Sequence, residues 1–155
     1  MIKIFIGIVL VIITTFLGYR YADKFKYRTF VFEKLNTFNM LAVSQIGVTN
    51  ITVENSINQL KNVLSETLKN VDAFLSGETF ICEDKKLSQE QRIVVSNYIN
   101  TLGTSDAYNQ KQLLINQGEI LKNEALTAKT LSEKFSKLSV RLGFSLGLII
   151  TVIII

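Results

Sequence analysis

The sequence of 155 residues contains no histidine and no proline, and Cys82 is its only cysteine. Without histidine there are no Ser-His or Cys-His nucleophile pairs and no histidine metal ligands. A lone cysteine cannot form an intramolecular disulfide, and Cys82 lacks the neighbours that activate a catalytic thiol. The acidic residues are scattered, and no glycine-rich phosphate loop is present. The sequence therefore predicts no catalytic residue, no cofactor, no metal and no small-molecule substrate.

The absence of proline permits long helices, and the charge distribution indicates where they meet a membrane. Lysine and arginine number 17 and aspartate and glutamate 13, for a net charge of +4. Basic residues gather beside two apolar stretches and not on an aromatic-basic platform, which favours a membrane over nucleic acid. These basic residues are Arg20, Lys24, Lys26, Arg28 and Lys34 after the first stretch, and Lys129, Lys134, Lys137 and Arg141 before the second.

The first apolar stretch, residues 1–19, has Lys3 as its only charged side chain. It lacks a small-x-small cleavage site, so a retained anchor is expected and not a cleaved signal. The second stretch, residues 142–155, would form a helix only ~21 Å long, against a bilayer core of ~30 Å. It crosses the bilayer if residues 138–141 extend the span and the basic side chains there reach out to the membrane surface. Otherwise it inserts only to a shallow depth.

The basic residues of both stretches predict one orientation. They follow the first stretch and precede the second, and the richer side of a span faces the cytoplasm. We therefore expect an integral protein of the cell membrane with both termini outside. Residues 20–141 would form a cytoplasmic domain between two transmembrane helices at residues 1–19 and 142–155.

Apolar residues at steps of three and four predict an all-α fold, an antiparallel bundle of about five to six helices flanked by the N- and C-terminal transmembrane helices. One helix covers residues 21–48 and is open to being continuous with the first span. A break at 47–52 precedes a helix capped by Thr52 that runs to about residue 75, with a kink near Asn70. Ser88 and Gln91 form a capping-box pattern before a short helix that ends near Leu102.

The next turn, with the sequence Leu102-Gly103-Thr104-Ser105-Asp106, starts the longest helix. Gly103 suits a left-handed position, a serine or threonine is expected to cap the helix, and Asp106 complements its positive end. An apolar stripe then continues to the second span; it consists of Leu114, Leu121, Ala128, Leu131, Phe135, Leu138 and Leu142.

Small residues recur every four positions near the C-terminus, a spacing that lets membrane helices approach closely. The first span carries a similar face. Glycine is also common in membrane helices without a packing role, and the sequence leaves open whether the partner helix lies in the same chain or in another copy. The residues are Ser139, Gly143, Gly147 and Thr151 near the C-terminus, and Gly7, Thr14 and Gly18 in the first span.

Residues 79–86 are predicted to be a loop that contains the charge run Glu83-Asp84-Lys85-Lys86. This run is either a docking point for a partner protein or an ordinary solvated loop. The tripeptide Asn50-Ile51-Thr52 fits a glycosylation sequon, but a cytoplasmic loop would not meet the machinery, and the match is attributed to chance.

The C-terminal third resembles the stage III sporulation protein AB family of endospore-forming bacteria. The resemblance is carried by LGTSDAYNQKQLLI from Leu102 with Gln110, by EALTAKTLSEKFSKL, and by RLGFSLGLIITVIII at the end. The first loop departs from the family pattern: Gln45-Ile46 replaces an acidic-Ile pair, and Ile51-Thr52-Val53 replaces Thr-Pro-Leu.

The resemblance implies a fold similar to a cytoplasmic domain of the inner-membrane platform protein of type II secretion and type IV pilus machines. It implies a non-enzymatic subunit in the mother-cell membrane around the forespore, within a channel-like complex. The implied partners are the cytoplasmic ATPase, stage III sporulation protein AA, and other subunits of the complex. The alternative is a two-span sensor or signalling subunit with a helical reader domain.

Overall fold

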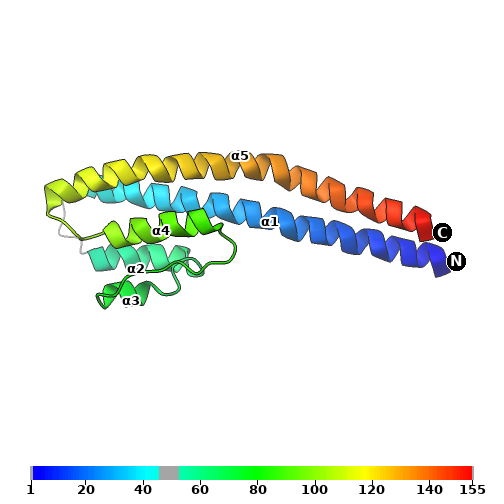
Figure 1. The fold of residues 1–155 in the computed structure, drawn as a ribbon, viewed down its shortest axis with the longest axis horizontal. Coiled ribbons are helices and arrows are strands. Elements are labelled where there is room, and N and C mark those ends of the chain that lie inside the picture. The colour runs from blue at the N-terminus through cyan, green and yellow to red at the C-terminus, as the bar shows by residue number, and fades with distance from the viewer. Residues whose placement is uncertain (1, 46–52, 155) are drawn as a thin grey trace. The chain divides into compact units, whose positions relative to one another are not determined.

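The computed structural model describes residues 2–45 and 53–154, and their regular structure is entirely helical (Figure 1). Its helices are α1 (Ile2–Gln45), α2 (Val53–Val63), α3 (Val71–Leu75), α4 (Gln89–Thr101) and α5 (Ala107–Ile154). The predicted all-α fold is confirmed. The expected break at 47–52, the Thr52 cap, the sequon and the departures from the family pattern at Ile46, Ile51 and Thr52 lie outside the described residues.

The first apolar stretch and the helix expected after it form one helix, α1, of 44 residues. The terminal helix α5 is also continuous, over 48 residues. Neither contains proline, and a helix without proline keeps every interior N–H available for its ladder.

Contacts divide the chain into two compact units. Residues 1–29 and 126–155 form one unit, which we call the helix pair, and residues 30–125 form the other, which we call the helical domain.

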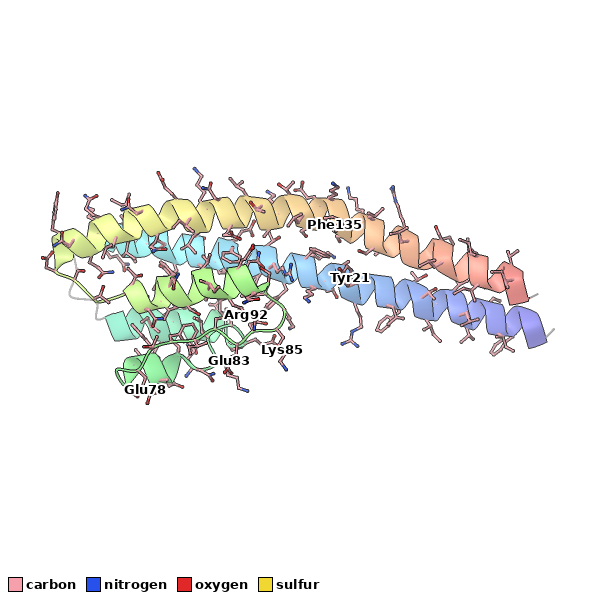
Figure 2. The ribbon with its side chains drawn as sticks, in the orientation of Figure 1. Tyr21, Glu78, Glu83, Lys85, Arg92 and Phe135 are labelled. Carbon is pink, nitrogen blue, oxygen red and sulfur yellow. The ribbon has the colours of Figure 1, made fainter. Side chains whose placement is uncertain are left out.

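In the helix pair, the start of α1 and the end of α5 run antiparallel, so that both chain ends lie at the same end of the pair (Figure 1). Ala22 and Ala128 are buried between the two helices. Large apolar side chains cover the outward faces (Figure 2). Among the most exposed are Phe5, Ile12, Phe16, Leu17, Ile149, Val152 and Ile153. Few side chains are buried between these two helices, and many large apolar ones point outward. This distribution is typical of helices that are surrounded by lipid.

The helical domain has its own core, to which all five helices contribute. The fully buried side chains include Val31, Phe32, Leu35, Ile57, Leu64, Leu68, Val71, Phe80, Tyr98, Ile99, Leu114 and Leu121. Phe38 meets the Tyr98 ring edge-on at a centroid distance of 6.5 Å. Capping of α4 is as predicted, because the Ser88 hydroxyl accepts from the Gln91 N–H and the Gln91 side chain accepts from the Ser88 N–H.

The predicted helix up to residue 75 is wrong in one respect, because α2 ends at Val63 and turns follow until α3 begins at Val71. The apolar spacing continues through this break, with Leu64 and Leu68 both buried, so periodicity did not reveal it. The cause is tertiary: the hydroxyl and carbonyl of Thr67 bond to residues of the loop 79–86.

The predicted apolar stripe on α5 is wrong at its C-terminal end. Leu114, Leu121 and Ala128 are buried, but Leu138 and Leu142 are 43% and 52% exposed. In the helix pair the small residues face inward, and these two leucines face outward.

Candidate functional site

The helix pair is closed by the small residues that the sequence singled out. A Cβ atom added to Gly7 would strike the Thr151 side chain. One added to Gly18 would lie 2.5 Å from the Ser139 carbonyl oxygen, and one added to Gly143 would lie 2.6 Å from the Thr14 carbonyl oxygen. These distances are below any real Cβ contact, so the structure brings the two predicted faces together within one chain, and glycine is required there.

Thr14 and Thr151 add polar contacts to this interface. The Thr151 hydroxyl lies 3.1 Å from the Gly7 carbonyl oxygen and 2.8 Å from that of Gly147 in its own helix. The Thr14 hydroxyl donates within α1, to the Leu10 carbonyl at 3.0 Å. Both hydroxyls therefore find acceptors at the interface, as polar groups in a water-poor contact require.

An aromatic stack lies further along the helix pair, away from the chain ends. The rings of Phe25 and Phe135 are stacked at 5.5 Å, and Tyr21 meets Phe25 edge-on at 5.4 Å (Figure 2). The basic residues at this end of the pair are Arg20, Lys24, Lys26 and Arg28 of α1 and Lys129, Lys134, Lys137 and Arg141 of α5. Because the helices are antiparallel, both basic clusters fall at the same end.

The turn between α4 and α5 is a structural joint of the helical domain. Gly103 has a φ of 75°, a left-handed conformation that suits glycine. The cap of α5 differs from the prediction, because it is the Asp106 carboxylate that accepts from the Asn109 N–H at 2.9 Å. The exposed Ser105 makes no such bond to any residue that the structure describes, and the Thr104 hydroxyl instead donates to the Thr101 carbonyl at 3.0 Å. Leu102 is buried beneath the turn.

Gln110, one of the residues that carried the family resemblance, is also structural. Its side-chain amide donates to the Thr101 carbonyl at 3.0 Å, which ties the start of α5 to the end of α4.

Residues 79–84 form an extended segment with alternating burial, held against α4 by side chains. The Asn100 amide pairs with both backbone groups of Phe80, at 2.8 Å to its N–H and 2.9 Å to its carbonyl. One turn earlier, the Ser96 hydroxyl accepts from the Cys82 N–H at 2.9 Å. Phe80 and Cys82 are consequently buried, and Ile81 points outward with 65% of its surface exposed.

The predicted partner-facing run Glu83–Lys86 is divided by the structure. Asp84 is only 9% exposed, and its carboxylate accepts from the Thr67 hydroxyl at 3.0 Å and the Lys86 N–H at 2.9 Å. Asp84 therefore anchors the loop and does not face a partner. Glu83, Lys85 and Lys86 remain exposed.

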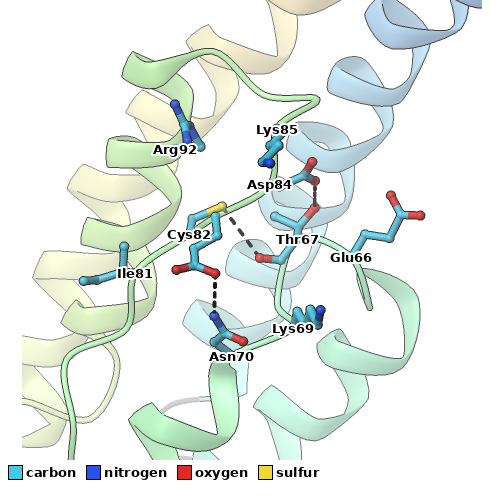
Figure 3. Close-up of a pocket in the computed structure, with 10 residues that line it drawn as sticks. Glu66, Thr67, Lys69, Asn70, Ile81, Cys82, Asp84, Lys85 and Arg92 are labelled. Carbon is cyan, nitrogen blue, oxygen red and sulfur yellow. Dashed lines mark hydrogen bonds between the residues drawn. The ribbon is translucent and has the colours of Figure 1, made fainter.

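A cavity of about 600 Å³ lies between this loop, the turns at 66–70 and the start of α4 (Figure 3). Its charged lining residues are Glu66, Lys69, Glu83, Asp84, Lys85 and Arg92. Cys82 forms part of the wall, and its thiol donates to the Thr67 carbonyl at 3.6 Å. Burial raises the pKa of the Cys82 thiol, which disfavours the reactive thiolate.

Sequence reasoning missed two features of the helical domain. Arg92 lines the cavity, and its Nε is buried without an acceptor among the described residues. Gly118 makes room for the buried Asn39, whose amide donates to the Leu114 carbonyl at 3.0 Å. An isolated glycine inside a long helix was a usable signal for the second feature, but nothing in the sequence distinguishes Arg92 from other surface arginines.

A sequence model of the family described as stage III sporulation protein AB matches residues 3–155. The chain belongs to this family. The match extends the resemblance seen in the C-terminal third to essentially the whole chain, including the divergent first loop. No curated protein and no solved structure matches the chain significantly.

Two helices of this stage III sporulation protein AB family member are long and apolar enough to cross a membrane, over Phe5–Gln45 and Tyr108–Ile153. Together with the family, they indicate a membrane-associated sporulation protein. Within residues 2–45 and 53–154, no group of three or more histidine, cysteine, aspartate or glutamate side chains is placed to hold a metal ion.

Proposed function

We propose that this protein is a non-enzymatic platform subunit of a secretion-like or channel-like complex between mother cell and forespore. The helix pair spans the membrane around the forespore, and the helical domain lies in the mother-cell cytoplasm. There it docks the complex's ATPase, stage III sporulation protein AA, and other membrane subunits.

The observation that carries this proposal is the charge asymmetry of the helix pair. Its outward faces are apolar, its inner faces are small, and the basic clusters of α1 and α5 share the end opposite to the chain termini. A span orients with its basic end in the cytoplasm, so the segment between the clusters belongs there. A cytoplasmic ATPase would meet the helical domain on that side.

The non-enzymatic part of the proposal rests on the side chains that are present. The one thiol, Cys82, is 4% exposed and its pKa is raised by burial. The carboxylates of the cavity are engaged with Thr67, Asn70 and Lys86. A buried thiol and bonded carboxylates suit a binding surface better than acid–base or nucleophilic chemistry.

The orientation is tested with single cysteines in protoplasts of vegetative cells that are made to produce the protein, so that the outer face of its membrane is open to the medium. Cys82 itself is unsuitable because it is buried, so Lys85→Cys is placed in a Cys82→Ala background and Ile2→Cys serves as the matched control. An impermeant maleimide should label Ile2→Cys in intact protoplasts and Lys85→Cys only after lysis. Labelling of Lys85→Cys before lysis would place the domain outside, contradict the platform function and support the two-span sensor.

Docking is tested by copurification of the intact, membrane-extracted protein from sporulating cells. The ATPase and other subunits of the complex should associate with it. Their absence from the purified material, with the protein correctly oriented, would refute the docking role.

A further inference from the structure

We propose that the cavity between residues 66–70, residues 81–85 and the start of α4 docks an acidic, extended segment of a partner protein, with Arg92 binding its carboxylate. This inference rests on the platform function, because it names the surface and the chemistry through which a partner would bind.

The acidic side chains around the cavity are already bonded. Glu83 accepts from the Asn70 amide at 3.1 Å (Figure 3). Glu66 is paired with the Lys86 ammonium. Asp84 is held by the two bonds described above. None of these carboxylates depends on a cation of the cavity wall for its partner.

The basic side chains of the cavity are in the opposite situation. The side chains of Lys69, Lys85 and Arg92 make no hydrogen bond or ion pair with residues 2–45 or 53–154. The Nε of Arg92 is buried and has no acceptor among the described residues. A guanidinium presents parallel donors that match a carboxylate. The cationic side chains of the cavity therefore lack an anionic partner.

The extended segment beside the cavity indicates a protein ligand. The N–H groups of Phe80 and Cys82 point to α4, where Asn100 and Ser96 bind them. Alternate residues of an extended chain direct their backbone groups to opposite sides, so those of Ile81 face away from α4. They have no partner among the described residues.

An exposed edge of this kind can pair with an extended peptide, and the Ile81 side chain, 65% exposed, offers an apolar contact beside it. A phospholipid headgroup would use the cations alone and would leave this edge unpaired. The geometry thus favours an acidic peptide with alternating apolar residues.

The test uses the full chain in nonionic detergent and a fluorescein-labelled peptide of alternating glutamate and valine. Fluorescence anisotropy should show saturable binding, and a peptide with glutamine in place of glutamate should not bind. Arg92→Gln and Lys85→Glu should each weaken binding by about tenfold, the loss of one charge-assisted contact. Lys111→Glu, the same charge change on an exposed residue of α5 outside the cavity, should leave binding unchanged.

Equal binding of the glutamine peptide, or equal weakening by Lys111→Glu and Lys85→Glu, would overturn the proposal. Displacement of the peptide by inorganic phosphate or by micelles of phosphatidylglycerol at comparable concentration would also overturn it, because the cavity would then bind anions in general and not a peptide. Peptide binding that persists while the ATPase fails to copurify would refute the platform function and leave the cavity assignment standing. The converse result would refute the cavity assignment alone.

Discussion

The Thr151 hydroxyl donates to the Gly7 carbonyl oxygen at 3.1 Å and so joins two residues 144 positions apart in the sequence. This bond exists because Gly7 has no side chain to separate the helices. It fixes the register of the helix pair near the chain termini, while the stack of Phe25 on Phe135 fixes it nearer the basic end. These two contacts, at opposite ends of the helix pair, are compatible with a single antiparallel register of α1 and α5.

Cysteines at these two positions should form a disulfide within the chain. A Cβ atom at Gly7 would lie 3.4 Å from the Thr151 Cβ, close to the separation in disulfides, about 3.5–4.5 Å. Gly7→Cys with Thr151→Cys, in a Cys82→Ala background, should yield an oxidised monomer on a non-reducing gel. The pair Gly7→Cys with Val152→Cys, with Val152 77% exposed, is the control and should stay reduced. Disulfide-linked dimers would show that the small faces pair between copies.

Bulk at Gly147 should separate the two helices. A Cβ atom there would lie 2.8 Å from the Val11 Cα, and backbone atoms cannot give way. Gly147→Leu should destabilise the protein by about 1–3 kcal/mol, measured by denaturant titration in micelles. Ser145→Leu adds the same side chain at an exposed position of α5 and should change stability by less than about 0.5 kcal/mol. Equal effects of the two substitutions would count against close packing at Gly147.

The turn before α5 should tolerate only residues that adopt a positive φ. With φ at 75°, Gly103→Val should destabilise the full chain by about 1–3 kcal/mol and lower its Tm. Asparagine enters the left-handed region more readily, so Gly103→Asn should cost clearly less. A Tm for Gly103→Val equal to that of Gly103→Asn would contradict a conformational requirement for glycine.

The Asn100 amide should control the order of the extended segment. Asn100→Asp keeps the acceptor for the Phe80 N–H but replaces the donor to its carbonyl with a repelling oxygen. It should destabilise the domain by about 1–3 kcal/mol and speed amide exchange in residues 79–84. Asn97→Asp makes the same change on the exposed side of α4 and should do neither. Unaltered exchange in Asn100→Asp would refute the tether.

Local patterns in the sequence were sufficient for much of this fold. Apolar periodicity and the absence of proline predicted long helices, and the Ser88 and Gln91 spacing predicted the start of α4, since each signal lies within one or two turns of helix. The small-residue faces were also evident. Their pairing within one chain was not, because Gly7 and Thr151 look the same in sequence whether the partner is intramolecular or not.

The candidate site depended on long-range contacts that no local pattern encodes. Asp84 belongs to a charge run that is typical of a solvated loop, but it is buried and accepts a hydrogen bond from Thr67, 17 residues earlier. Arg92 could not be singled out from the sequence, because the cavity that it lines is formed by three separate segments of the chain.

The thiol of Cys82 should make stability fall at alkaline pH. Burial raises its pKa above the value of 9.0 expected in the unfolded chain, so the folded state holds its proton to higher pH. The contribution of Cys82 is therefore constant below pH 9.0 and declines as the pH rises above it toward the folded value. The free energy of unfolding, measured by denaturant titration from about pH 8 to about pH 10, should decrease more steeply in the wild type than in Cys82→Ala. Tyr98, whose pKa burial also raises, is present in both proteins, so the difference between the two slopes isolates Cys82. Identical slopes would show that the thiol ionises as freely in the folded state as in the unfolded one.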